Sequence, residues 1–279
     1  MCSVLIKIDR VFARVRAGLK ALVHSAYVLC GVPERIILSS DKNKFIAIPD
    51  SVTAIGWEGF SKCDSLTDIT IPCSVNYIDG WAFADCPSLA EIKVSADNKH
   101  YSSLNGVLFN KNMTSLMCYP EAKTDTGYDI PDSTAVIESA AFLNCSNITN
   151  ITMPDSVTDI EYMAFDNCIN LSQVNLSSGL TDLGSEIFAG CSSLKSIVIP
   201  DSITSFGDLT FDNCTALTDV TLPSDLCSIG VQTFRGCTSV KTITVPASVE
   251  EIGIKAFGYK DYSDLIDGFT LNCYSGTTG

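Results

Sequence analysis

Hydrophobic positions recur with a period of 23 along most of the chain. In one copy Ile197 and Ile199 alternate with positions expected to be exposed, as in a strand with one buried face. Pro200 ends that strand because it has no N–H to donate to a neighbouring strand. After a turn, Ile203 and Phe206 send two more apolar side chains inward, which predicts a second, shorter strand. Since so short a unit buries its apolar side only against its neighbours, the pattern predicts a β-rich solenoid of about nine coils.

A phenylalanine occupies one fixed position in each copy, and these positions are one period apart at every step but one. Two residues further on, asparagine and glycine alternate, which predicts a left-handed residue that ends a single helical turn. We therefore expect each coil to hold a strand, a bend, a short strand and a helical turn, with the phenylalanines stacked as a structural spine. The spine residues are Phe60, Phe83, Phe142, Phe165, Phe188, Phe211, Phe234 and Phe257.

The bend before each helical turn holds glycine in five copies, at positions 56, 184, 207, 230 and 253. Asp79, Glu138 and Glu161 occupy the same position in other copies. A positive φ is therefore not compulsory there, since only glycine adopts it freely.

The repeat C-x-x-L-x-x-I-x-I-P-x-S-V-x-x-I-G-x-x-A-F resembles the BspA-type subclass of leucine-rich repeats over about residues 45 to 258. The resemblance implies a leucine-rich repeat solenoid with parallel β-strands and short helical turns. It also implies a surface or secreted protein, because family members are typically such proteins in anaerobic bacteria and some protozoa. They are commonly interpreted as adhesion or protein-binding arrays.

Residues 1–44 differ from the repeats and predict an N-terminal amphipathic helix. This helix would act as a cap over the first coil or as an export leader, although His24 interrupts the apolar stretch that a leader needs. Two other interpretations are a wrongly assigned start codon and a peripheral membrane anchor. No apolar run reaches the length of a membrane span. The apolar positions are Val4, Ile8, Val11, Phe12, Val15, Leu19, Leu22 and Val23, and the basic ones are Lys7, Arg10, Arg14, Arg16 and Lys20.

The coil at about residues 94–130 is expanded, since the interval from Cys86 to Cys145 equals two periods plus 13. Inside it, two strand-like runs flank the polar residues 110–113, which predicts a hairpin. Ser103 to Phe109 and Tyr119-Pro120 resemble a variant form of the same repeat family. The insert is either a structural elaboration or a binding site. Residues 259–279 leave the register, and we expect them to be a truncated tail.

Charge and cysteine content restrict the partners and the chemistry. The 18 basic and 32 acidic side chains give a net charge of −14, which argues against nucleic acid and anionic membranes as partners. Of 13 cysteines, seven share one column of the repeat, and none forms a C-x-x-C pair. Parallel side chains one rung apart have poor geometry for disulfides, so we expect a ladder of buried free thiols. The column holds Cys63, Cys86, Cys145, Cys168, Cys191, Cys214 and Cys237.

Catalytic residues are few. His24 and His100 are the only histidines, and no nucleophile elbow, phosphate loop or zinc-protease motif is present. Asp132 and Asp155 share a turn column, where they would solvate turns or contact calcium. We expect no enzyme activity, no cofactor and no metal.

The sequence leaves two functions open: a recognition module for a protein or glycan at the cell surface or in secretion, and a passive spacer that presents a further domain. Free thiols also fit a reducing cytosol, so a cytoplasmic location is not excluded. Outward residues of the first strand form a regular array, which is the usual recognition surface of a solenoid. This candidate partner-binding face consists of Thr70, Lys93, Thr152, Asn175, Val198, Thr221 and Thr244.

Overall fold

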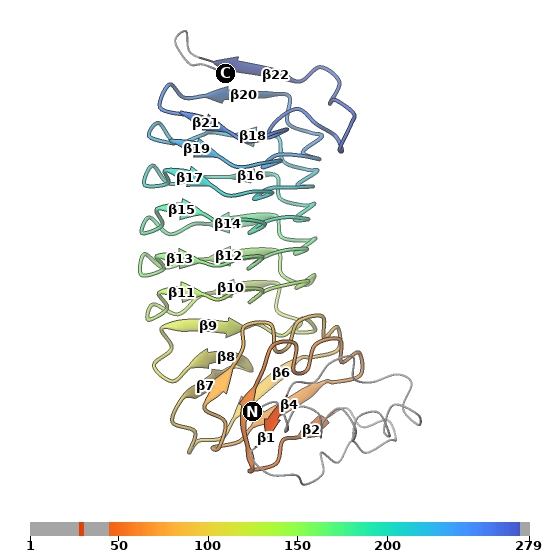
Figure 1. Ribbon diagram of the computed structural model, residues 1–279, viewed down its shortest axis with the longest axis vertical. Coiled ribbons are helices and arrows are strands. Elements are labelled where there is room, and N and C mark those ends of the chain that lie inside the picture. Colours follow the sequence, from red (N-terminus) through yellow and green to blue (C-terminus); the bar gives the residue numbers. More distant parts are fainter. Residues whose placement is uncertain (1–27, 31–44, 274–279) are drawn as a thin grey trace.

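The structure is a computed structural model, which describes residues 28–30 and 45–273. The coils lie one on another in an elongated stack, and strands account for all the regular structure of the described residues (Figure 1). The helix predicted for the N-terminal segment lies outside these residues, except that Val28–Cys30 forms a strand, β1. The prediction of a β-solenoid of about nine coils with parallel strands is confirmed.

One side of the stack is built from the first strand of each coil. Within the regular copies, these strands pair in parallel one period apart, so that Ile69 lies opposite Ile92 and Ile151 opposite Val174. The last pair, β20 and β22, is also parallel but is offset by 28 residues. The strands are β2 (Phe45–Ala47), β4 (Asp68–Ile71), β6 (Glu91–Val94), β10 (Gly127–Asp129), β12 (Asn150–Thr152), β14 (Gln173–Asn175), β16 (Ser196–Ile197), β18 (Asp219–Val220), β20 (Thr242–Val245) and β22 (Thr270–Cys273).

A second side holds the shorter strands, which also pair in parallel from coil to coil. At its N-terminal edge β1 pairs antiparallel with β3, with Val28 opposite Ile55. The chain thus covers this edge with a strand of its own. The short strands are β3 (Val52–Ile55), β5 (Tyr77–Ile78), β11 (Val136–Ile137), β13 (Asp159–Ile160), β15 (Asp182–Leu183), β17 (Ser205–Phe206), β19 (Ser228–Ile229) and β21 (Glu251–Ile252).

The third side, which we call the turn face, holds hydrogen-bonded turns where a helical turn was predicted. In one coil the N–H groups of Ala141, Leu143 and Cys145 each donate to the carbonyl three residues earlier. Ala140 and Asn144 have positive φ, at 58° and 59°. The left-handed residue predicted two positions after the phenylalanine is present, and a second one lies two positions before it.

The alternation of asparagine and glycine at that position has a steric cause. A Cβ atom on Gly190 would overlap the side-chain oxygen of Asn167 in the preceding coil. Gly236 stands in the same relation to Asn213. A glycine therefore follows an asparagine along the stack because the asparagine side chain occupies the space.

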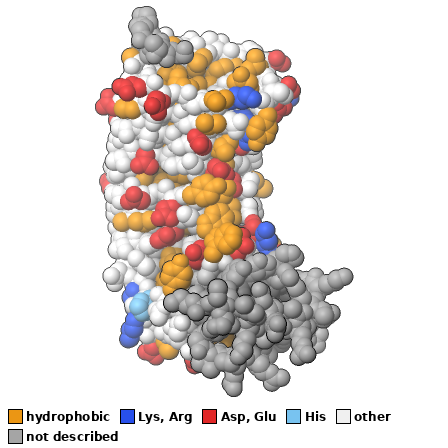
Figure 2. Space-filling view, in the orientation of Figure 1, with side chains coloured by type: hydrophobic (Ala, Val, Ile, Leu, Met, Phe, Trp, Pro, Cys, Tyr) orange, Lys and Arg blue, Asp and Glu red, His pale blue; other side chains and the backbone are white. Residues whose placement is uncertain are grey.

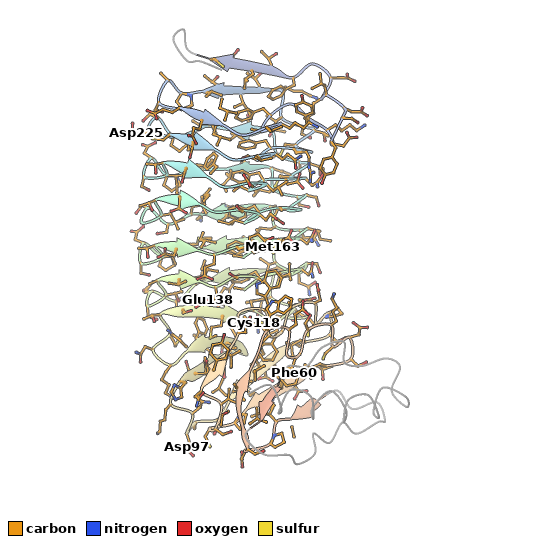
Figure 3. All side chains as sticks on the ribbon, in the orientation of Figure 1. Phe60, Asp97, Cys118, Glu138, Met163 and Asp225 are labelled. Carbon is orange, nitrogen blue, oxygen red and sulfur yellow. The ribbon has the colours of Figure 1, made fainter. Side chains whose placement is uncertain are left out.

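The phenylalanine rings stack through the interior (Figure 3). Phe188 is fully buried, with its ring centroid 5.3 Å from Phe165 and 5.7 Å from Phe211. Between Phe83 and Phe142 the place is taken by Tyr119, whose ring stacks on Phe142 at 5.0 Å. Tyr119 lies one period before Phe142, so the expanded coil keeps the register although its aromatic residue differs.

The expanded coil contains the predicted hairpin and a further strand. β8 (Val107–Asn110) pairs antiparallel with β9 (Ser115–Cys118) and with β7 (Tyr101–Leu104). Side chains of this sheet divide the core in two: Leu108 and Met117 join the N-terminal cluster, while Phe109 and Leu116 join the C-terminal one. The insert is thus a packed layer between two parts of the stack.

An arginine that is ion-paired between two of the last coils also contacts the tail of the described chain. Arg235 donates to both carboxylate oxygens of Asp212, at 2.7 and 2.6 Å, and both side chains are nearly buried. The guanidinium also lies 4.4 Å from the centroid of the Tyr262 ring. β22 then pairs with β20 and ends the described stack.

Candidate recognition surface

The candidate partner-binding face lies on the first-strand side. Its members are exposed except for Thr152, which is half-buried, and Val198 has 83% of its surface exposed. Because the pleat alternates, these side chains stand outward while Ile151 and Ile197 fill the core. The strands therefore hold the outward residues on a fixed backbone.

The structure divides this face into three parts. Thr152 lies opposite Asn175, which forms a bridge with Val198, and β16 and β18 continue the register toward Thr221. Thr70 and Lys93 are paired with each other, but the expanded coil separates them from the rest. Thr244, in β20, lies opposite Asn272 in β22 and forms the third part. We call the continuous middle part, Thr152, Asn175, Val198 and Thr221, the central column.

Two residues belong to this array but escaped sequence reasoning. Asp129 lies opposite Thr152 and extends the central column. Its position one period before Thr152 was the available signal, but it stands at the end of the expanded coil. Asn272 lies more than one period after Thr244, so the repeat does not point to it.

From Cys86 onward, the cysteines of the repeat form a ladder of buried free thiols, as predicted. From Cys86 onward, each Sγ of the column donates to the carbonyl of the aromatic residue 26 positions earlier, as Cys168 does to Phe142 at 3.1 Å and Cys214 to Phe188 at 3.1 Å. Burial raises the pKa of these two thiols. From Cys86 onward, the thiols of the column therefore satisfy buried backbone carbonyls and are not nucleophilic.

A cluster of polar groups lies where the two parts of the core meet. The Glu121 carboxylate accepts a bond of 2.7 Å from the N–H of Cys86, and Asn144 donates to Asp85 at 2.9 Å. Burial, opposed by the hydrogen bond from the Cys86 N–H and helped by the charge of Asp85, raises the pKa of Glu121 to about 7. These contacts join the N-terminal and C-terminal coils.

We expect Glu121→Gln to stabilise the chain at pH 8 and to change little at pH 4, below the ordinary pKa of a glutamate. The pKa in the folded state lies above the ordinary value of 4.5, so the proton binds more tightly in the folded chain. The stability that this proton contributes is full at low pH and is lost as the pH rises through about 7. Glutamine removes that loss and keeps an oxygen for the Cys86 N–H. Urea unfolding at both pH values measures the difference, with Glu251→Gln as an exposed control; an equal effect at both values would contradict the argument.

The histidines and turn aspartates noted in the sequence do not come together in a site within the described residues. His100 is exposed, and His24 lies outside the described residues. Asp132 and Asp155 are exposed on turns, where Asp155 accepts from Ser178. Across the described ranges, histidine, cysteine and carboxylate side chains do not gather in any group that could hold a metal ion.

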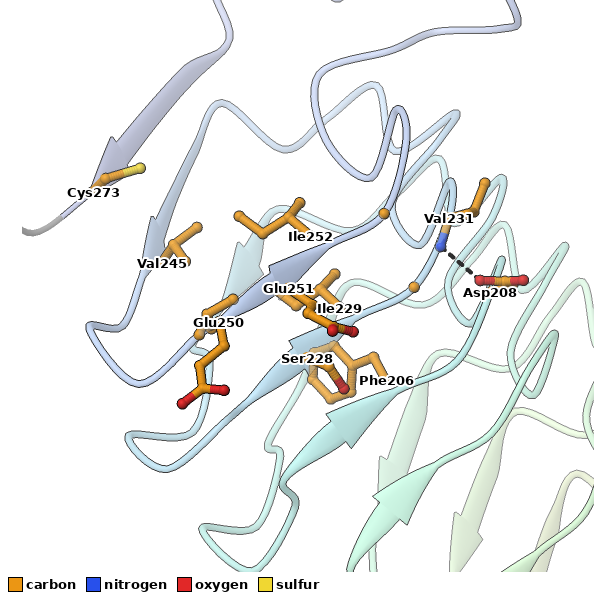
Figure 4. A pocket seen from close by; sticks show the side chains of 13 residues that line it. Phe206, Asp208, Ser228, Ile229, Val231, Val245, Glu250, Glu251, Ile252 and Cys273 are labelled. Atoms are coloured by element: carbon orange, nitrogen blue, oxygen red, sulfur yellow. Dashed lines mark hydrogen bonds between the residues drawn. The ribbon is translucent and has the colours of Figure 1, made fainter. Parts of the chain in front are cut away.

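A hollow of about 640 Å³ opens at the C-terminal end of the stack (Figure 4). Val245, Glu250, Glu251, Ile252 and Cys273 are among the residues that line it. In residues 28–30 and 45–273 we find no helix with the length and apolarity needed to cross a membrane.

Comparison with known proteins shows where this solenoid belongs. The model of the BspA type leucine rich repeat region matches residues 36–125 and 126–263, in 6 copies. A leucine-rich repeat protein of Eubacterium ventriosum is 30% identical, with a TM-score of 0.64 over 78% of this chain and 65% of its own. A leucine rich cell surface protein of Faecalibacterium prausnitzii is 33% identical, with a TM-score of 0.58 over 77% and 56%. A Bacteroides ovatus leucine-rich repeat protein is 25% identical, with a TM-score of 0.56 over 82% and 59%.

The chain thus spans less than two thirds of the length of these structures. No protein of curated function matches it. The family model, however, covers most of the chain with the repeat that forms the coils. The chain belongs to the BspA-type leucine-rich repeat family.

Proposed function

We propose that this chain is a non-enzymatic recognition module that binds an extended protein or glycan along the first-strand side, at the cell surface or after secretion. The observation that carries the proposal is the central column, in which Thr152, Asn175 and Val198 stand outward on paired parallel strands. Successive coils place such side chains about 4.8 Å apart. A partner that repeats its groups along its length meets them with little ordering cost.

The chemistry of the column narrows the kind of contact. Thr152, Asn175 and Thr221 offer hydroxyl and amide groups, Val198 offers an apolar one, and none of the four carries charge. Binding there depends on hydrogen bonds and shape. We therefore expect affinity to change little between low and moderate salt, unlike contacts that depend on ion pairs.

Surface location is part of the proposal and has separate support. The related Faecalibacterium prausnitzii protein is described as a cell surface protein. A spacer that holds another domain away from the cell is the second candidate function, and the elongated stack of coils favours it equally (Figure 1).

Capture by the immobilised chain separates the two functions. Solubilised matrix and cell-envelope fractions are passed over the wild-type chain and over a variant with lysine at the four central-column positions. A matched control carries lysine at Thr158, Thr181, Thr204 and Cys227, which are exposed on the second side. The module captures a partner with wild type and control but not with the column variant. A spacer captures nothing with any of the three chains.

A further inference from the structure

The sheet on the second side of the stack ends in an open edge at β21, whereas the first-strand side continues to β22. Glu251 and Gly253 donate their N–H groups back to the preceding coil, Gly253 to the Ile229 carbonyl at 2.7 Å. Alternate residues of a strand direct their backbone polar groups to opposite sides, so the N–H and carbonyl of Ile252 point off the stack. Among the described residues, no further strand pairs with this edge.

The hollow of about 640 Å³ lies beside this edge (Figure 4). Val245 and Cys273, from β20 and β22, line it together with Ile252 from β21. In the preceding coil Ile229, the counterpart of Ile252, has 2% of its surface exposed, whereas Ile252 has 39%. The hollow therefore offers the place of one more short strand, whose inward apolar side chain would cover Ile252.

The residues around the hollow are acidic, and Figure 2 shows acidic side chains gathered near the C-terminal end of the stack. Asp208, Glu250 and Glu251 line the hollow, and its lining includes no lysine or arginine. Asp208 already accepts a bond of 2.7 Å from the N–H of Val231. Glu250 and Glu251 are exposed, and within residues 28–30 and 45–273 neither forms an ion pair. Basic side chains opposite these two glutamates would complement their charge.

Close approach of the coils determines one further residue of an added strand. A Cβ atom on Gly253 would overlap the backbone of Gly230, and a Cβ atom on Gly230 would overlap the backbone of Gly207. Successive coils thus leave no room for a side chain at this position. A strand that lies on β21 in the same register therefore needs glycine opposite Gly253.

A second copy of the chain fits this edge poorly. Two copies joined end to end at β21 would set Glu250 and Glu251 against the same residues, and like charges opposite one another destabilise a strand pair. A second copy joined head to tail would present β1, which runs antiparallel to β3 and has the sequence Val-Leu-Cys without a basic side chain. The charge of the edge therefore favours a segment of another protein.

We propose that β21 is a docking edge for an extended segment of a partner protein, which adds a parallel strand with the pattern apolar-basic-basic-apolar-glycine. These five residues lie opposite Val249, Glu250, Glu251, Ile252 and Gly253, in that order. Backbone hydrogen bonds to the edge supply affinity, and the side chains supply specificity. The central column lies on a different side, so this contact does not depend on the proposed recognition function.

The hexapeptide acetyl-Leu-Lys-Lys-Ile-Gly-Thr-amide tests the charge complementarity when it is titrated into the full chain and followed by amide chemical shifts. It should bind at least about tenfold more tightly than the same peptide with glutamate in place of both lysines. Glu250→Lys combined with Glu251→Lys should reverse this preference. Asp159→Lys combined with Asp182→Lys changes the net charge equally, at exposed positions of earlier coils on the same side, and should leave the preference as in wild type.

Methylation of single peptide nitrogens tests the added strand. The N–H of the peptide glycine is expected to donate to the Ile252 carbonyl, as Gly253 does to Ile229, so its methylation should weaken binding at least about tenfold. The N–H of the peptide isoleucine points away from β21, as that of Ile252 points away from β19, and its methylation should change binding less than about twofold.

Four results would overturn the proposal. The first is no binding of the hexapeptide at about 1 mM. The second is a lysine preference that survives the Glu250 and Glu251 substitutions, and the third is an equal effect of both methylations. The fourth is slow hydrogen exchange of the Ile252 amide in the chain without peptide, because the edge would then be covered already. A second copy covers it if the protection rises with chain concentration, and the same chain covers it if the protection does not.

Discussion

Replacing Phe188 with alanine is expected to lower the free energy of unfolding by about 3 to 5 kcal/mol. The ring is fully buried and lies between Phe165 and Phe211, at 5.3 and 5.7 Å. Alanine leaves a cavity between two coils whose backbones are held by the hydrogen bond from the Phe188 N–H to Thr210 at 2.9 Å, so the site cannot collapse freely.

Phe257→Ala serves as the comparison for the free energy of unfolding lost in Phe188→Ala. Its ring stacks on Phe234 at 5.5 Å and is the last of the spine in the described chain, where 8% of its surface is exposed. Phe257→Ala is therefore expected to cost clearly less than Phe188→Ala. Urea unfolding monitored by circular dichroism measures both, and equal losses would show that burial between two rings does not set the effect.

Gly230→Ala is expected to destabilise the chain by about 2 to 3 kcal/mol, although only one methyl group is added. A Cβ at this position would overlap the backbone carbon and oxygen of Gly207 in the preceding coil. These are backbone atoms, so the clash is relieved only by moving one coil away from the next.

The copy two periods earlier provides a matched control. At Gly184 the nearest atoms to an added Cβ, the Ile160 oxygen and the Ile187 Cδ1, lie 3.7 Å away, which is ordinary contact. Gly184→Ala should therefore leave stability within about 0.5 kcal/mol of wild type, or raise it slightly by restricting the unfolded chain. Equal destabilisation by both substitutions would contradict the argument from close approach.

Much of the fold could be predicted because the same apolar positions recur in every copy of the repeat. A strand that alternates over a few positions is weak evidence alone, but Ile197 and its counterparts recur at one spacing, and stacking is the only way to bury them. The bend was also predictable in one respect, since Glu138 and Glu161 excluded a compulsory positive φ. Gly207, Gly230 and Gly253 allow close approach of the coils, which depends on spacing between backbones that no single copy reveals.

Other features depend on contacts between copies. The second left-handed position holds residues such as Met163 and Leu209, which carry no local signal for positive φ, so the turns could not be told from a helical turn. β7 was missed although Asn105-Gly106 is a strong hairpin signal. The division of the candidate face at Lys93 followed from the insert, which packs into the stack as a layer.

The most direct test of the proposed function is the affinity of the captured partner for chains altered on the central column. Lysine at Thr152, Asn175, Val198 and Thr221 should leave folding largely intact and weaken binding at least tenfold, about 1.4 kcal/mol. Lysine at Thr158, Thr181, Thr204 and Cys227 should leave the affinity unchanged. Because Tyr119 belongs to the aromatic stack, the hairpin is tested by Lys111→Glu and Asn112→Glu at its exposed tip. An affinity that survives the central lysines and falls with the tip substitutions would contradict the account and place recognition on the insert.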